Sequence, residues 1–185
     1  MNQEQLLEQC INRTRICIEK VFILQNRPLH ELRWSTNAKQ WNVLQCIHHL
    51  NLYYEFYNPE IEHQLQQAQS AEDTDSFKSG VIGGYFVKTI QVSNSKKMKA
   101  VAAMEPHPTG LTSKVLSDFV QHGQTLLRLF EMAKNVDLNK VKTAISLTKW
   151  IRLKLGDTFL FMVNHNERHV KQAERVLEEF ESFKD

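Results

Sequence analysis

Four long stretches with apolar residues at helical spacing limit this chain to a helical architecture. In each stretch the apolar residues recur at i, i+3, i+4 and i+7, which is the pattern of a helix with one buried face. Only 6 glycines and 4 prolines occur, too few for the many tight turns of an all-β fold. No repeat has a fixed period, and one long irregular link joins the second and third stretches. We therefore predict an all-α, up-down four-helix bundle, with residues 1–185 as a single domain. The first three helices span about residues 3–24, 38–65 and 111–135. The fourth begins between residues 150 and 157 and ends at about residue 180.

The irregular link, residues 66–110, is polar at first and then apolar. Its segment Gly80 to Phe86 mixes glycines with large apolar residues, which we interpret as a flexible apolar flap, with a short helix over 85–91. The other connection contains a β-like patch, Thr143 to Leu147, that is too isolated to build a sheet. Residues 150–155 after it could already be helical.

The overall charge gives no sign of a charged partner. Lys and Arg number 23 against 21 Asp and Glu, a formal net charge of +2, which predicts neither a nucleic-acid nor a membrane partner. No stretch approaches about 18 apolar residues, and the N-terminus has no basic segment before an apolar run. We therefore expect a cytoplasmic protein.

The three cysteines lie inside apolar helical patterns and lack C-x-x-C spacing; they are Cys10, Cys17 and Cys46. We interpret them as buried thiols in a reducing compartment. Cys46 lies three residues before His49, so a nucleophilic role for it is the less favoured alternative.

A pair of histidines on the last helix is half of a metal site. His165 and His169 are four residues apart, so their side chains share one helix face. Two imidazoles leave a divalent ion short of the three protein ligands that catalytic zinc sites usually have, and an isolated pair is more often packed or exposed. The pair is not the zincin motif, because Glu167 lies third in H-N-E-R-H where that motif needs it second.

A third ligand can come from the second helix. His48 and His49 lie in a strongly apolar segment, where a neutral ring needs a hydrogen-bond partner or a metal. They are about 100° apart around the helix, so only one can point fully inward. Periodicity leaves the choice between them open.

Several short motifs, taken in order, resemble the DinB/YfiT-like superfamily of metal-binding four-helix bundles. They are Trp34-Ser35, Trp41 through Asn51, Leu155-Gly156-Asp157, and His165 to Gln172. In that family a histidine near the middle of the second helix, usually followed by leucine, joins an H-x-x-x-H pair on the last long helix. The resemblance implies that His49, His165 and His169 bind a divalent metal and that His48 is a neighbour of the site.

Three further side chains lie one helical turn from an expected ligand. Gln45, Tyr53 and Gln172 could each orient a ring or a bound water, or could be ordinary helix residues. Three histidines suit zinc, nickel, iron or manganese, and ligand type does not choose among these ions. No catalytic residue beyond the metal can be named from the sequence.

The resemblance implies a metal-dependent enzyme that acts on a small molecule. Known activities in the family suggest a thiol-dependent S-transferase, using a low-molecular-weight thiol such as bacillithiol or mycothiol, or a hydrolase. The alternatives are a non-catalytic, stress-related bundle that binds a metal or ligand, and a helical interaction module with a degenerate site. We expect a homodimer, by the same resemblance.

Overall fold

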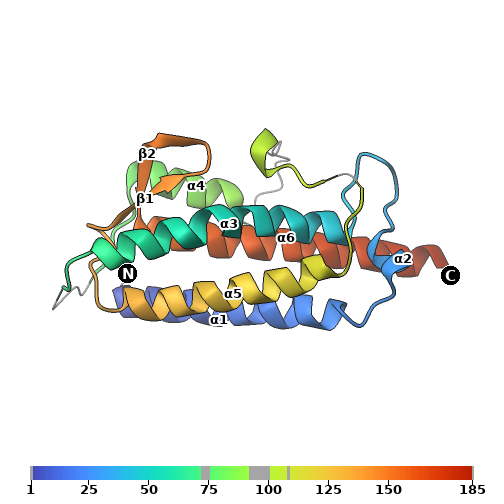
Figure 1. Cartoon of the computed structure of the whole chain (residues 1–185), viewed down its shortest axis with the longest axis horizontal. Helices are drawn as coiled ribbons and strands as arrows, with labels where there is room; N and C mark the ends of the chain where they lie inside the picture. The colour runs from blue at the N-terminus through green and yellow to red at the C-terminus, as the bar shows by residue number, and fades with distance from the viewer. Residues whose placement is uncertain (1, 72–75, 92–100, 108, 185) are drawn as a thin grey trace.

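The protein is mostly helical, and its four long helices lie side by side along the longest axis (Figure 1). The structure is a computed structural model that describes residues 2–71, 76–91, 101–107 and 109–184. Its elements are α1 (Gln3–Leu24), α2 (Leu29–Leu32), α3 (Val43–Gln67), α4 (Val81–Ile90), the 3-10 helix η1 (Ala102–Met104), α5 (Lys114–Ala133), β1 (Lys142–Ile145), β2 (Thr148–Lys154) and α6 (Leu155–Lys184).

The buried apolar side chains of α1, α3, α5 and α6 form one hydrophobic cluster. This confirms the four long helices that the apolar periodicity predicts. α3 continues through Pro59 without a break, because Pro59 and Glu55, whose carbonyl loses its usual donor, both lie on the exposed face of the helix. At Gly123, α1 and α5 come very close together. A Cβ atom on this glycine would lie only 2.7 Å from Cγ1 of Ile18, so a larger residue would require Ile18 to move.

The directions of the helices differ from a strict up-down alternation. The Asn51 side chain donates to the Val115 carbonyl at 2.9 Å, and the Asn58 side chain donates to the His122 carbonyl at 3.0 Å. Both pairs are 64 residues apart, so α3 and α5 run in the same direction. The expected up-down alternation is therefore wrong at the step from α3 to α5. The link of residues 68–113 is long enough to return the chain to the end where α3 began, whereas a short loop forces neighbours to be antiparallel.

α1 and α6 also run in the same direction. Two charged pairs join the helices, Arg13 with Glu167 and Lys20 with Glu174, and a third, Arg27 with Glu181, follows just after the end of α1. The partners of each pair are 154 residues apart. α3 and α6 are antiparallel, because Trp41 lies against His169 and Tyr53 lies against Phe161.

A β-hairpin occupies the connection between α5 and α6, where no sheet was expected. β1 and β2 pair antiparallel, with Lys142 opposite Lys154 and Thr143 opposite Leu153. The predicted patch supplies the first strand, and the residues that could have been helical supply the second. An isolated hairpin is marginal in water, but this one packs on α3 and α6, and the Ala144 amide donates to the Glu60 carboxylate at 2.8 Å.

The predicted apolar flap and the short helix predicted over 85–91 form one helix, α4, which begins at Val81, four residues earlier than expected. It packs on α6 through a buried carboxylate. Asp157 has no exposed surface, and it accepts hydrogen bonds from the Ser79 hydroxyl and, at 2.9 Å, from the Gly80 amide. A Cβ on Gly83 would overlap the same carboxylate. Asp157 therefore fixes the start of α4 against the first turn of α6. Among the described residues, no helix is both long and apolar enough to cross a lipid bilayer.

Candidate metal centre

Three histidines from α3 and α6 meet in the interior of the bundle. Each of His49, His165 and His169 offers a ring nitrogen, and these three atoms lie within 4.8 Å of one another. His49 and His165 are each 2% exposed, and His169 is partly buried. The rings are close together, with centroids 4.6 to 5.0 Å apart in the three pairs. The group that could hold a metal ion contains only these three among the described residues.

A main-chain carbonyl orients the His49 ring. The Nδ1 atom of His49 lies 2.5 Å from the Met104 carbonyl oxygen. Because a carbonyl can only accept, Nδ1 carries the proton and Nε2 keeps its lone pair. That Nε2 atom lies 3.2 Å from Nε2 of His165, so the two nitrogens point at the same small volume.

A side-chain amide orients the His169 ring in the same way. Nδ1 of His169 lies 3.0 Å from the Gln172 side-chain oxygen, which again assigns the proton to Nδ1 and leaves Nε2 as a donor to a metal. Nδ1 of His165 is buried and has no hydrogen-bond partner within the described part of the chain. Two of the three rings are thus held in the tautomer that metal binding through Nε2 requires.

Burial keeps the three imidazoles neutral at ordinary pH. It lowers the pKa of His49 to about 4, and it lowers the pKa of His169, with help from the neighbouring His49, to about 3. The pKa of His165 also lies well below its ordinary value, chiefly because of burial and then because of His169 and His49. Neutral imidazole is the form that coordinates a metal, so protons compete little with an ion at pH 7.

Aromatic rings enclose the histidines. Tyr53 lies 4.2 Å from the His165 ring centroid, and Phe161 stacks on the same ring at 5.5 Å with an interplanar angle of 16°. Trp41 lies 4.9 Å from His49 and 5.9 Å from His169. These rings exclude water from several sides of the centre, which strengthens electrostatic interactions inside it.

The other predicted site residues fall into two groups. Tyr53 and Gln172 contact ligand candidates, as described above. His48 lies outside the triad and packs edge-on against His107, with centroids 5.1 Å apart. Gln45 forms a capping box with Asn42 at the start of α3, where each side chain bonds the other's backbone amide.

The predictions for one further histidine and for the cysteines have different outcomes. Polar neighbours in the sequence predict a solvated side chain for His122, but it is half-buried and stacks on Tyr54 with centroids 5.7 Å apart. The three cysteines are buried as predicted, but burial raises the pKa of the Cys46 thiol to about 12, so it is not a thiolate nucleophile at neutral pH.

Sequence reasoning missed the Met104 carbonyl. It lies in the irregular link, and a main-chain acceptor has no signature in residue type. In the sequence, Trp41 and Phe161 look like ordinary apolar helix residues. Only the packing of α3 on α6 shows that both contact the histidines.

The residues present fit a bound divalent ion. Three neutral imidazoles form the donor set of a catalytic zinc site, and bonds from Nδ1 to a carbonyl and an amide are the usual support for such ligands. Two surface cavities lie away from the three histidines. One of about 460 Å³ is lined by residues of 64–71 and the hairpin region, and one of about 550 Å³ lies beside Trp34 and Phe183.

Comparison with known sequences gives one result. A sequence profile of the DinB superfamily matches residues 7–173, a range that contains all three histidines. No curated protein and no solved structure matches the chain closely enough to count as a relative.

Proposed function

Since this chain belongs to the DinB superfamily, we propose that His49, His165 and His169 bind one divalent metal ion that serves a reaction on a small molecule. The observation that carries the proposal is the convergence of three ring nitrogens within 4.8 Å. Zinc, nickel, iron and manganese all suit three imidazoles, so the donor set does not select the metal.

The proposed chemistry is transfer to or from a low-molecular-weight thiol, or hydrolysis. An ion bound by three neutral ligands keeps its full positive charge, and it can polarise a substrate or lower the pKa of a bound water or thiol towards neutrality. The protein's own groups position and shield that ion. Met104 and Gln172 fix two rings, while Trp41, Tyr53 and Phe161 keep water away.

Metal content tests the proposal most directly. The protein is purified without a polyhistidine tag and its metal is measured by elemental analysis. We expect about one equivalent, lost in His49→Ala, His165→Ala and His169→Ala. His48→Ala is the matched control, because it removes a histidine from the neighbouring position of the same helix, and we expect it to keep the metal.

Two results contradict the ligand assignment. Less than about a tenth of an equivalent in the wild type, unchanged by His49→Ala, would remove the metal proposal altogether. Loss of the ion in His48→Ala with retention in His49→Ala would identify His48 as the ligand from α3.

A second candidate function is a non-catalytic, stress-related bundle with a structural ion. The near-complete burial of His49 and His165, each 2% exposed, and the surrounding rings favour it. Cobalt substitution tests the thiol-dependent reaction against a structural ion. If the site serves that reaction, adding a small thiol to the cobalt-loaded protein gives a new thiolate-to-metal absorption band. A spectrum that no thiol changes removes the thiol-dependent reaction and leaves hydrolysis or the structural ion.

A further inference from the structure

The balanced net charge hides an uneven distribution of charge. Segments 76–91 and 138–156 contain seven of the 23 lysine and arginine residues and none of the 21 aspartate and glutamate residues. The fold brings these two segments together, because α4 contacts β2 and the Lys154 ammonium donates to the Lys78 carbonyl at 2.7 Å. The region of α4 and the hairpin stays cationic when its neighbours Asp157, Asp137 and Glu60 are counted, because seven cations exceed three carboxylates, while the rest of the chain has an acidic excess.

Some of these cations have acidic neighbours from other segments. Glu60 lies 3.9 Å from Arg152, and Asp137 lies 3.7 Å from Lys140. Within the described residues, Lys78, Lys88 and Lys142 make no ion pair, and all three are exposed. Their charge is therefore available to a partner.

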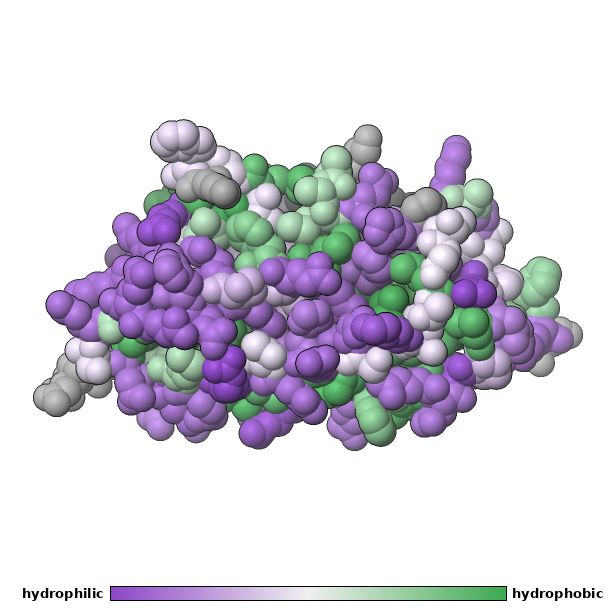
Figure 2. Space-filling view, viewed as in Figure 1, coloured by the Kyte–Doolittle hydropathy of each residue, from purple (hydrophilic) through white to green (hydrophobic). Residues whose placement is uncertain are grey.

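Large apolar side chains are exposed among these cations. Val81 is 94% exposed and Trp150 is 95% exposed. Figure 2 shows apolar residues along the upper edge of the molecule, over α4, in the same view as Figure 1. The exposed apolar residues of α4 and the hairpin are Val81, Ile82, Tyr85, Leu147, Trp150 and Ile151. Together with Lys78, Lys88 and Lys142, we call them the α4–hairpin surface.

We propose that the α4–hairpin surface binds the surface of a lipid bilayer that contains anionic lipids. Tryptophan and tyrosine favour the region of the headgroups, and aliphatic side chains enter the boundary of the acyl chains. Lysines near the bilayer are attracted to anionic headgroups. The α4–hairpin surface has all three kinds of side chain, and this contact needs no helix that spans the bilayer.

A second copy of the chain fits this surface poorly. In a two-fold symmetric dimer the same patch would face itself, so the lysines of one copy would oppose those of the other. Nucleic acid would use the lysines and could stack on Tyr85 and Trp150, but Val81, Ile82 and Ile151 offer nothing to phosphates and cannot stack on bases. The combination of charge and aliphatic side chains favours lipid.

The contact requires no rearrangement of the fold. Asp157 fixes the start of α4 to α6 through Ser79 and Gly80, and the hairpin packs on α3 and α6. The exposed side chains are thus presented by segments that are already folded.

Vesicle flotation with the full chain tests the proposal. Vesicles of neutral phosphatidylcholine are compared with vesicles that contain about 30% phosphatidylglycerol, at low salt and at about 0.5 M salt. We expect a partition coefficient at least about tenfold higher for the anionic vesicles, and most of that difference is lost at high salt. Fluorescence of the bound wild type should shift to the blue, and Trp150→Phe should remove the shift.

Variants separate the apolar and the electrostatic contributions. We expect Val81→Ser with Trp150→Ala to lower binding to anionic vesicles roughly tenfold, and Lys88→Glu with Lys142→Glu to reduce it to the level of neutral vesicles. The matched control is Ile23→Ser, because Ile23 is 58% exposed on α1, outside this surface. It should bind like the wild type. Because all of the substituted side chains are exposed, the variants should keep the fold, which circular dichroism checks.

Four results would overturn the proposal. The first is equal binding of the wild type to neutral and anionic vesicles. The second is an equal loss of binding in Ile23→Ser and in the surface variants. The third is tighter binding to a duplex oligonucleotide than to anionic vesicles, which would replace lipid by nucleic acid. The fourth is self-association that Trp150→Ala abolishes, which would replace lipid by a second copy.

Discussion

α6 packs on both α1 and α3, and it contacts these two helices with opposite kinds of side chain. Along α1 it makes charged pairs at the surface, whereas along α3 it places histidines and an amide in the interior. We call these contacts the α1 seam and the α3 seam. The comparison shows that one helix can use one face to set its register and another face to build a site.

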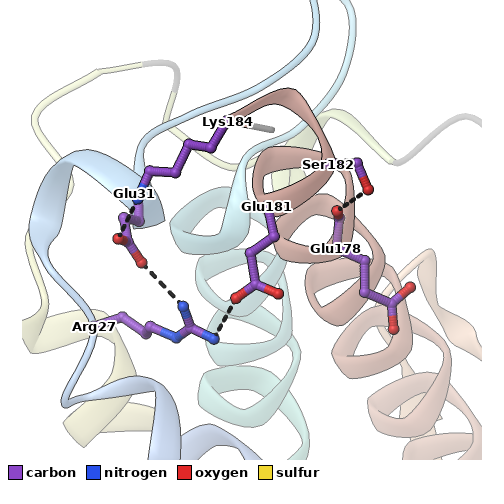
Figure 3. Close-up of polar contacts among 6 residues, drawn as sticks. All are labelled: Arg27, Glu31, Glu178, Glu181, Ser182 and Lys184. Carbon is purple, nitrogen blue, oxygen red and sulfur yellow. Dashed lines mark hydrogen bonds and ion pairs between the residues drawn. The ribbon is translucent and has the colours of Figure 1, made fainter.

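The α1 seam is a regular series of charges. Arg13, Lys20 and Arg27 are seven residues apart, and each pairs with an acid on α6. A spacing of seven keeps the pairs of Arg13 and Lys20 on one side of two helices that wrap gently around each other, and Arg27 continues the series just after the end of α1. In Figure 3 the last pair, Arg27 with Glu181, extends to Glu31, which Lys184 also contacts.

The α3 seam is buried and contains polar side chains. Besides the histidines, Asn166 donates from its side chain to the Tyr54 hydroxyl at 2.6 Å, and both residues are almost fully buried. An unpaired polar group in such a place costs more than an exposed ion pair contributes. The α3 seam should therefore respond strongly to substitution, and the α1 seam weakly.

The largest expected effect is that of metal on the α3 seam. At a free Zn²⁺ concentration about a thousandfold above the Kd, binding to the folded state alone raises the free energy of unfolding by about 4 kcal/mol. Chemical denaturation with and without Zn²⁺ measures this gain. It should vanish in His165→Ala and persist in Arg13→Ala, and a gain that survives His165→Ala would show that zinc binds elsewhere.

The metal-free α3 seam should also make stability depend on pH. Burial lowers the pKa of His49 to about 4 and that of His169 to about 3. In the unfolded chain the same two histidines take up protons below their ordinary pKa of 6.5. This stability is fully present above about pH 6.5 and is lost as pH falls towards 4. We expect a loss on the order of 3 kcal/mol for each of these two histidines, measured by denaturation in chelator at several pH values. His49→Leu should flatten the profile, and an unchanged slope would contradict this cause.

Removing one hydroxyl from the α3 seam should have a smaller effect. Tyr54→Phe leaves the Asn166 amide without its buried partner, which costs about 1–3 kcal/mol. Urea denaturation measures the loss. Tyr85→Phe is the matched control, because Tyr85 is exposed and should change stability by less than about 0.5 kcal/mol. Equal effects of the two changes would contradict the predicted difference between buried and exposed hydroxyls.

The next smaller effect on stability is expected for the strongest ion pair of the α1 seam. Arg13 donates to both carboxylate oxygens of Glu167 and also to the Asn164 side chain, and the Arg13 and Glu167 side chains are 29% and 30% exposed. A double-mutant cycle of Arg13→Ala and Glu167→Ala should give a coupling of about 1–2 kcal/mol. A coupling near zero would mean that the α1 seam does not set the register of α6 by charge.

The smallest effect is expected for the exposed pair Lys20 and Glu174, whose side chains are 44% and 33% exposed. The same cycle with Lys20→Ala and Glu174→Ala should give about 0.2–0.5 kcal/mol, falling further in about 0.5 M salt. A coupling as large as that of Arg13 with Glu167 would remove the distinction between the two pairs.

The helices could be predicted from the sequence because each has its own periodic signal. The bounds of α1 follow from its apolar stripe, and Pro59 is tolerated because its face of α3 is exposed. Contacts between elements were harder to predict. Nothing local shows that α5 runs parallel to α3, because the long link allows either direction, and β2 becomes a strand only when it pairs with β1.

The candidate site was predictable in part. The H-x-x-x-H pair of His165 and His169 is visible from spacing, but the choice of His49 over His48 needed the family resemblance. The structure brings His49 to the pair and leaves His48 beside His107. The Met104 carbonyl could not be found, because main-chain atoms look alike in every residue.

The parallel pairing of α1 with α6 has a consequence for the order of synthesis. Arg13 and Glu167 are 154 residues apart, so at about 5–20 residues per second the ribosome makes the second roughly 8–30 s after the first. During that interval the face of α1 that α6 later covers has no partner in the chain. A nascent chain stalled before α6 should therefore be held by chaperones or degraded, and should not accumulate as a three-helix protein.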